Sequence, residues 1–407
     1  MLKCLKLIQS NQPVTSRIRV GVSLVLGLLS GLNALAQPTN LTPSAKPLAT
    51  SLSTVVDKKN LGETGFLSAE WSFGLQGQSF SNEKEQAQVA GLALGGKVRY
   101  GLLPSLEVKL DAAANLQTGY AQSRFGENVP KNGPELHEAV IQYKPIPRFT
   151  LQAGAINQAH LSSPLIVSAQ AFPATLERIL LGSKLFNVEI KAQQAVPTSS
   201  TLSTKSLDAE QMPTFMTEGL TIRTKFAQRV ALSVFAFHYA FNDLPSVVAS
   251  DSELYGNTVT EVTAKRSQFT YGFDGFSYGG GAKVLMARET VWMIDGQIVR
   301  NASAPASYNQ AYLATTGFEF GLRGDVDLKP KAEYFFAESD VTPGYYNGSD
   351  RGHNNRRGWA ADVSATFKKA GFTIGGRYVM SELINASLNQ TRQSFILLRF
   401  ESLHALL

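Results

Sequence analysis

The sequence alternates apolar and polar residues over most of its length. The stretch 135–157, ELHEAVIQYKPIPRFTLQAGAIN, shows this most clearly: Ala139, Ile141 and Tyr143 are apolar, and alternation resumes after a Lys-Pro-Ile-Pro turn. A period of two on both sides of a short turn predicts a β-hairpin. One face of this hairpin is apolar, whereas the other carries charges, amides and glycine. The apolar face therefore meets either a second sheet or lipid.

The same alternation predicts about sixteen strands (roughly 14 to 18). The stretch 105–120 is the cleanest, because its charged residues share one face of a strand but would scatter around a helix. The stretch 175–181 alternates least. Besides the two strands of the hairpin 135–157, we place strands at 65–80, 88–100, 105–120, 175–181, 185–195, 215–225, 229–241, 269–285, 290–300, 311–323, 326–338, 359–368, 372–382 and 392–401.

The connections alternate in length as well. Short links lie at 101–104, 145–147, 182–184, 226–228, 286–289, 324–325 and 369–371. Long polar links lie between them, at 121–134, 158–173, 197–213, 242–267, 301–310, 339–356 and 384–391. Short periplasmic turns and long extracellular loops are typical of outer-membrane barrels, and a soluble sandwich has no reason to alternate in this way. We therefore predict an all-β fold, a closed antiparallel transmembrane β-barrel.

The first 36 residues have the pattern of a secretory signal peptide. Basic residues precede an apolar core at 20–29, and small residues then lead to an Ala-x-Ala site before Gln37. Cleavage is expected at about Ala36/Gln37. Residues 37–62, rich in Pro, Ser and Thr, are expected to form a flexible periplasmic lead-in. The barrel is expected to occupy residues 63–407.

Composition and charge argue against disulfides, nucleic-acid binding and transmembrane helices in the mature chain. The single cysteine, Cys4, lies in the predicted signal peptide, so the mature chain is expected to have no disulfide. That peptide carries four basic and no acidic residues, so its cleavage lowers the formal charge from +6 to near +2. The charge balance therefore gives no argument for binding nucleic acid. Beyond the signal, no window of about 18 apolar residues predicts a transmembrane helix.

A barrel of about sixteen strands is too wide for side chains to fill, so a water-filled channel is expected. Strand parity places many charges on the inward face, where water avoids the desolvation cost of burying them. The predicted pore-lining residues are Lys97, Arg99, Glu107, Lys109, Asp111, Glu138, Lys144, Glu189, Lys191, Arg223, Asp295, Glu319, Arg323, Lys329, Lys331 and Arg377. Basic groups are in modest excess and favour a weak anion preference. Cross-strand salt bridges are the alternative interpretation of each charge.

Two loops carry further signals. The loop 158–173, QAHLSSPLIVSAQAFP, has an apolar middle that solvent does not favour. We expect it to fold inward as a constriction loop that presents His160, Ser162, Ser163 and Gln170. The densest basic patch lies in an outer loop and comprises Arg351, His353, Arg356 and Arg357. This patch is predicted to gather anions or to bind lipopolysaccharide phosphates, the alternative being a solvated loop face.

The hairpin 135–157, with the residues that follow it to Leu165, resembles the corresponding hairpin of the phosphate-selective porin group. The matching residues are Glu138 and Tyr143 on an acidic-aromatic strand, and Leu151 and Gly154 in an L-x-x-G strand. The resemblance covers about thirty residues plus the sixteen-strand layout. It implies a trimeric, water-filled outer-membrane channel. Eyelets lined by lysine and arginine distinguish that group, whereas the loop 158–173 contains neither residue, so the resemblance does not extend to phosphate specificity.

The sequence favours an outer-membrane porin for passive diffusion of small hydrophilic solutes or ions. We expect no enzyme activity, cofactor or metal site, because no Ser/His or Asp/His pairing at strand spacing and no metal-binding motif occurs. Two alternatives stay open: a structural or adhesive barrel that binds ligands through its outer loops, and an outer-membrane hydrolase. The expected partners are the solutes or ions, outer-membrane lipid, lipopolysaccharide, and further copies of the chain in a homotrimer; nucleic acid is not expected.

Overall fold

The structure, a computed structural model, describes residues 65–82, 85–122, 130, 132–183, 185–199, 210–226, 229–261, 266–287, 289–322, 325–387 and 390–405. All of them belong to the unit Asp57–Leu407. The predicted signal peptide, the lead-in 37–62 and Arg323 lie outside the described residues.

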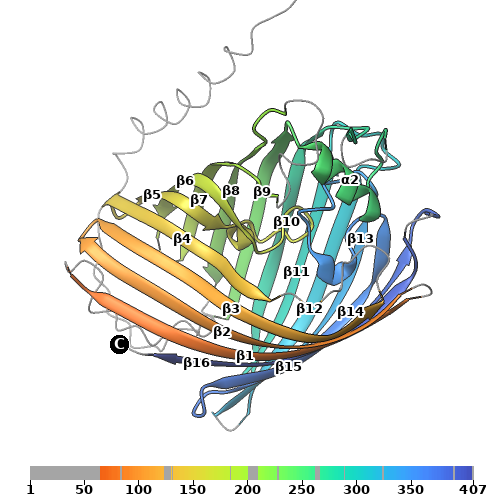
Figure 1. Cartoon of the computed structure of the whole chain (residues 1–407). Helices are drawn as coiled ribbons and strands as arrows, with labels where there is room; N and C mark the ends of the chain where they lie inside the picture. Colours follow the sequence, from red (N-terminus) through yellow and green to blue (C-terminus); the bar gives the residue numbers. More distant parts are fainter. Residues whose placement is uncertain are drawn as a thin grey trace, which may run out of the picture. The chain divides into compact units, whose positions relative to one another are not determined.

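Sixteen strands close into one antiparallel barrel, in which each strand pairs with its sequence neighbours and β1 pairs with β16 (Figure 1). This confirms the predicted fold class and strand number. The strands are β1 (Leu67–Asn82), β2 (Gln86–Leu103), β3 (Leu106–Gln122), β4 (Gly133–Ile146), β5 (Phe149–Asn157), β6 (Ala171–Gly182), β7 (Phe186–Ala195), β8 (Thr214–Phe226), β9 (Val230–Asn242), β10 (Phe273–Ala287), β11 (Thr290–Asn301), β12 (Gln310–Leu322), β13 (Val326–Ala337), β14 (Arg356–Phe367), β15 (Phe372–Leu383) and β16 (Gln393–Ala405).

The barrel wall exposes its apolar side chains on the outside. Leu116, Ile141 and Leu398 are 65%, 54% and 60% exposed, which is unfavourable in water and is expected where a wall meets lipid. Polar groups occupy the alternate, inward positions; buried Gln152, for example, donates to Gln142 across β4 and β5 at 2.8 Å. The wall is therefore apolar outside and polar inside.

At the end of the barrel with the long loops, the residue types on the outward face change from one group of strands to another. Over β10 to β15 this level carries exposed aromatic residues, among them Phe276, Tyr312 and Trp359. The pairing register continues from Phe276 through His238 on β9 to Glu218, Ala192 and Glu177 on β8, β7 and β6. The aromatic level therefore gives way to small and acidic residues over β6 to β8. An acidic residue that faces lipid is destabilising, so this part of the wall is poorly suited to lipid contact.

Two local features depart from simple alternation. A β-bulge between Asp111 and Ala112 shifts the register of β3 with β4. Strict parity predicts an outward His137, but the bulge brings its Nδ1 atom to 3.3 Å from Asp111 Oδ1 on the inward face. The last strand also runs to Ala405, beyond the predicted end at Glu401, because residues 401–405 pair with β1 and His404 stacks on Trp71 at 4.7 Å.

The described parts of the connections contain three short helices: η2 (Gln158–Leu161), α2 (Ser246–Leu254) and η3 (Ser349–Arg351). None of the helices in the described part of the chain is long and apolar enough to cross a membrane. The main apolar cluster gathers at the long-loop end, where Phe215 stacks on Phe241 at 4.3 Å and Phe241 stacks on Tyr346 at 5.8 Å. It joins strand ends to the loops that follow them, and so holds these loops against the barrel.

Candidate functional site

The segment 158–170, between β5 and β6, packs its apolar middle away from solvent. Ile166 is fully buried, and Leu165 and Val167 are 5% and 2% exposed. Much of this burial comes from the connection between β13 and β14. Thr342 donates to the carbonyl oxygen of Leu165 at 2.9 Å, and the backbone N–H of Ser168 donates to that of Tyr346 at 2.8 Å. Two loops far apart in the sequence thus fold as one layer.

Side chains from the wall hold the same segment from separate parts of the barrel. On β7, Gln193 donates to the side chain of Gln158 at 2.8 Å, and Lys191 donates to the carbonyl oxygen of His160 at 3.3 Å. On β11, Gln297 donates to the hydroxyl of Ser163. Because β7 and β11 are four strands apart in the barrel, a segment that reaches inward side chains of both must cross the interior.

A buried polar network ties in a third loop, which contains α2. Asn257 Nδ2 donates to the carbonyl oxygens of Ser339 and Thr342 at 2.7 and 2.9 Å. Asn354 Nδ2 donates to the same two oxygens at 3.1 and 2.6 Å. Asp340 accepts from the N–H and hydroxyl of Thr258, and burial of its carboxyl raises its pKa. We call the described residues of the three loops 158–170, 243–272 and 338–355 the loop plug.

The predicted outer basic patch is wrong for three of its four residues, because they are packed against other parts of the chain instead of lying exposed. Arg351 is 8% exposed and forms two hydrogen bonds with Glu333 of β13, at 2.7 and 2.8 Å. Arg377 of β15 and Asp350 complete a four-membered charge cluster. The acidic partners satisfy the guanidinium groups, so burial does not leave a charge unpaired.

His353 and Arg356 are held inside in a similar way. His353 stacks on Tyr255 at 4.1 Å, and its Nδ1 atom lies 2.9 Å from Asn347 Oδ1. Burial of the imidazole, reinforced by the nearby positive charge of Arg356, lowers the pKa of His353 to about 3. Arg356 is 4% exposed and donates to the carbonyl oxygen of Thr391 at 2.8 Å. Only Arg357 of the four lies exposed.

The four residues predicted on the loop 158–173 have different surroundings. His160 Nδ1 lies 2.9 Å from the carbonyl oxygen of Asn157, and burial lowers the pKa of this imidazole to about 4. Ser162 adopts a left-handed backbone conformation that ends η2. Ser163 is buried against Gln297, and Gln170 donates to the carbonyl oxygen of Tyr346 at 3.0 Å. These contacts are mostly structural.

A group of four charged residues lies on the inward face of β6 to β8, next to η2. Glu189 is buried and contacts three cations: Arg178 at 3.0 Å, Lys191 at 3.4 Å and Arg223 at 2.5 Å. One carboxylate neutralises one of the three positive charges. We call these four residues the cation cluster; Arg223 keeps 47% of its side chain exposed. Positive charge therefore faces open space beside the loop plug.

Another group of predicted residues forms a mixed-charge network on β2 to β4. Lys97 lies 3.2 Å from Asp111, which is paired in register with Glu138. Lys109, paired in register with Arg99, donates to Gln142 at 3.0 Å, and Gln142 donates to Glu107 at 3.0 Å. Lys144 lies near the short turn to β5. These contacts are the cross-strand pairs that the sequence left as an alternative.

The last predicted pore-lining residues lie on β11 to β13. Glu319 pairs with Lys329 at 3.1 Å, while Asp295 and Lys331 are on the inward face of β11 and β13. Within the described residues, no group of three or more His, Cys, Asp or Glu side chains is arranged to hold a metal ion.

The sequence missed several residues that shape the interior. Arg178 escaped notice because the stretch 175–181 barely alternates, and its face becomes clear only from the pairing of Arg178 with Lys191. Asn257 and Asn354 carried no signal, since 97 residues separate them. Helix α2 was also missed; its run Val247-Val248-Ala249, buried in the structure, was the one available sign.

Comparisons with known proteins identify the fold but no family. No protein-family model and no curated protein matches the sequence. Among solved structures, OprB of Pseudomonas putida matches with a TM-score of 0.55 and 10% identity, over 83% of this chain and 94% of that one. OmpT lacking loop L8, an outer membrane protein of Vibrio cholerae, reaches 0.49 at 7% identity over 83% and 99%. The outer membrane protein OprD from Pseudomonas aeruginosa reaches 0.45 at 10% over 83% and 94%. At these identities the OprB match supports a common barrel fold, and the two lower scores add no weight.

Proposed function

We propose that the protein is an outer-membrane porin, a water-filled channel for passive diffusion of small hydrophilic solutes or ions. The observation that carries this proposal is a closed sixteen-strand wall with an apolar exterior and an ionised interior. Barrels of this size leave an aqueous channel. The inward charges need that water, because burying them in a dry core would cost several kcal/mol per ion. Passive diffusion through such a channel requires no catalytic residue.

We propose that the segment 158–170 narrows this channel and that the cation cluster sets a preference for anions. Support comes from the contact between Lys191 and His160, which places the cluster at the edge of the segment. An anion that passes this edge meets Arg178, Lys191 and Arg223 with only Glu189 opposing them. Rings and clusters of basic groups attract anions in this way.

Single-channel recording in a planar bilayer under a salt gradient tests both proposals. We expect stepwise single-channel currents that are proportional to voltage. The sign of the reversal potential should show that anions permeate more readily than cations. The double variant K191Q/R223Q should lower the anion-to-cation permeability ratio severalfold, because it leaves Glu189 with Arg178 alone. K369Q is the matched control: Lys369 lies at a short turn, pairs with Asp325 at 2.7 Å and is 80% exposed.

Each outcome of that recording has a clear meaning. An unchanged ratio in K191Q/R223Q would exclude the cation cluster as the selectivity element. A folded barrel that stays electrically silent would exclude the channel and favour an adhesive barrel, whose ligand would bind at the long-loop end.

A closer relationship to the phosphate-selective porin group is also a proposal. Gly154, one of its matching residues, has a φ of 131°, and a Cβ atom there would clash with the carbonyl oxygen of Ala139. The hairpin therefore requires glycine for its close backbone approach. The basic residues of the cation cluster lie on the barrel wall and not on the loop. We therefore propose that the channel favours small anions in general, without specificity for phosphate.

We propose that the chain assembles as a homotrimer through the outward face of β6 to β8. Its small and acidic residues, Ala192 between Glu177 and Glu218, are unfavourable against lipid but compatible with a protein partner. The apolar pattern of the sequence alone predicts a different interface, near the first and last strands. In a gel of unheated samples, A192W should lose an oligomer that the wild type retains. A332W, on the outward face of β13, should keep it; equal behaviour of the two variants would count against this face.

A further inference from the structure

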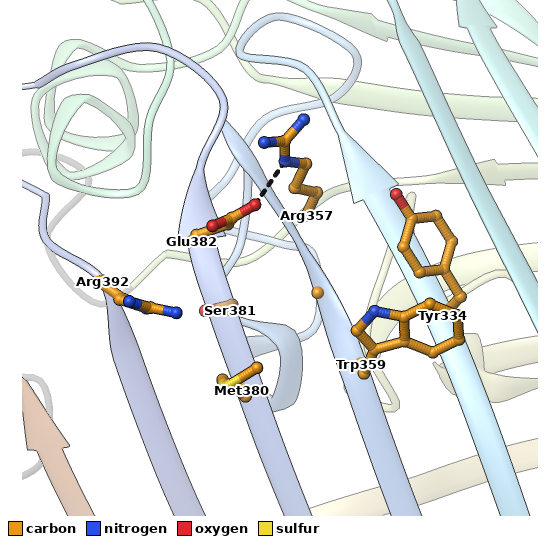
Figure 2. A pocket seen from close by; sticks show the side chains of 8 residues that line it. Tyr334, Arg357, Trp359, Met380, Ser381, Glu382 and Arg392 are labelled. Atoms are coloured by element: carbon orange, nitrogen blue, oxygen red, sulfur yellow. Dashed lines mark hydrogen bonds and ion pairs between the residues drawn. The ribbon is translucent and has the colours of Figure 1, made fainter.

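A pocket of about 280 Å³ opens on the outward face of β13 to β16, near the long loops (Figure 2). Arg357, Trp359, Met380, Glu382 and Arg392 line it. Arg357 is the second residue of β14, Glu382 the last but one of β15, and Arg392 directly precedes β16. The polar part of the pocket is thus at the strand ends, and its apolar part is further down the wall.

The pocket is positively charged at its upper edge. Arg357 Nε lies 2.7 Å from Glu382 Oε1, and both side chains are about half exposed. This contact uses the Nε edge of the guanidinium, and among the described residues no other hydrogen bond occupies its Nη groups. Arg392 is exposed, and its side chain points toward Ser381 of β15 from the side opposite Arg357 (Figure 2). Two arginines and one glutamate leave a net charge of +1 at a site that faces away from the channel.

The lower part of the pocket is aromatic and apolar. Trp359 is 59% exposed and lies against Tyr334, with ring centroids 4.5 Å apart. Met380 is 40% exposed between the tryptophan and the base of Arg392. Further down the same face, Tyr378 and Ile396 are 47% and 48% exposed. An apolar stripe therefore continues from the pocket toward the middle of the wall.

We propose that this pocket binds one phosphorylated lipid of the outer leaflet. Arg357 and Arg392 contact the phosphate, Trp359 and Tyr334 pack against the adjoining sugar or glycerol, and an acyl chain follows Met380, Tyr378 and Ile396. Paired arginines suit phosphate because their fork of N–H donors matches its oxygens. Tryptophan and tyrosine are the residues that favour the membrane interface.

The surroundings favour a lipid over a free anion or a protein partner. A soluble anion needs no aromatic floor and no apolar stripe below it. The pocket is also small, holding a phosphate and part of a ring but no peptide segment. The acidic face proposed for oligomer contacts lies on β6 to β8, on a separate part of the barrel. Of the four residues from which the sequence predicted lipopolysaccharide binding, Arg357 lines this pocket, whereas Arg351, His353 and Arg356 do not.

Tryptophan fluorescence in detergent tests the proposal without reference to conduction. The chain has three tryptophans, so W71F/W292F leaves Trp359 as the only reporter. The probes are bisphosphorylated lipid A, the same lipid A without its phosphates, and inorganic phosphate. We expect a saturable fluorescence change with the bisphosphorylated lipid, weaker binding by about tenfold or more without the phosphates, and no change with inorganic phosphate.

Variants of the pocket then separate charge from folding. R357Q/R392Q should weaken binding of the bisphosphorylated lipid by about tenfold or more, and E382Q should tighten it, because the opposing carboxylate is removed. R300Q is the matched control, since Arg300 is another exposed residue at the long-loop end of β11 and does not line the pocket. A fold check by heat-modifiable migration accompanies each variant.

Three results would overturn the proposal. Equal affinity for lipid A with and without its phosphates would show that the two arginines do not recognise a phosphate. Equal loss in R300Q and R357Q/R392Q would indicate diffuse charge attraction. A fluorescence response to inorganic phosphate alone would identify a site for free anions.

Discussion

Replacing Arg351 with methionine should release the loop plug from the wall and raise the single-channel conductance severalfold. Arg351 belongs to η3 in the loop, whereas Glu333 belongs to β13, so their two hydrogen bonds at 2.7 and 2.8 Å connect loop and wall. Both side chains are about one-tenth exposed. Removing one partner of a buried ion pair typically costs about 3–5 kcal/mol. In R351M the remaining cation, Arg377, lies 3.0 Å from Glu333 and 3.2 Å from Asp350, so one positive charge must serve two carboxylates and the cluster keeps a net negative charge. That cost is large enough to undock the loop.

The double variant R351M/E333Q distinguishes the broken pair from a simple loss of packing. It removes both charges, and Arg377 keeps its contact with Asp350 at 3.2 Å. We therefore expect conductance and protease sensitivity of the loop 338–355 to fall back toward wild-type values. K369M removes an exposed pair of similar geometry and should have no effect, since such pairs contribute about 0–1 kcal/mol. Wild-type conductance in R351M would contradict the role of this pair.

The barrel itself was predictable because each strand carries its own signal. In β3, the charges of Glu107, Lys109 and Asp111 alternate with apolar residues, and a single slip in register would move them all into lipid. The connections added a second constraint from their lengths. Both signals are local, so they require no knowledge of what a residue contacts elsewhere. Strand number and fold class followed from them directly.

The interior was less predictable because its contacts are non-local. The stretch around Arg351 and His353 is rich in glycine, asparagine and arginine, which normally indicates a solvated loop. Its burial depends on Glu333 in the wall and on Asn257 in another loop. Composition gives no sign that such distant partners will satisfy these groups. By contrast, the burial of Leu165-Ile166-Val167 was predictable from the sequence, because this run is apolar.

Acidification should also loosen the loop plug, because two of its histidines are neutral when docked. Burial lowers the pKa of His353 to about 3 and that of His160 to about 4, from an ordinary value near 6.5. Each undocked imidazole therefore binds a proton more readily than the docked one. The stabilisation is complete above pH of about 6.5 and is lost as the pH falls toward about 4 for His160 and about 3 for His353. Each pH unit within those windows removes up to about 1.4 kcal/mol per histidine.

Conductance and protease sensitivity measured between pH 7.5 and 4.5 should show this loosening as a rise in both on the acid side. H160N/H353N should flatten the rise, because asparagine keeps a polar group near Nδ1 but does not titrate. Asparagine also suits residue 353, whose φ of 66° lies in the left-handed region. Asp340, whose pKa burial raises, acts in the opposite direction but is present in both proteins, so it cancels in their difference. The same acid response in wild type and variant would place the pH sensitivity elsewhere, most directly in the inward carboxylates. A flat wild-type profile would mean that protonated histidines are accommodated without undocking.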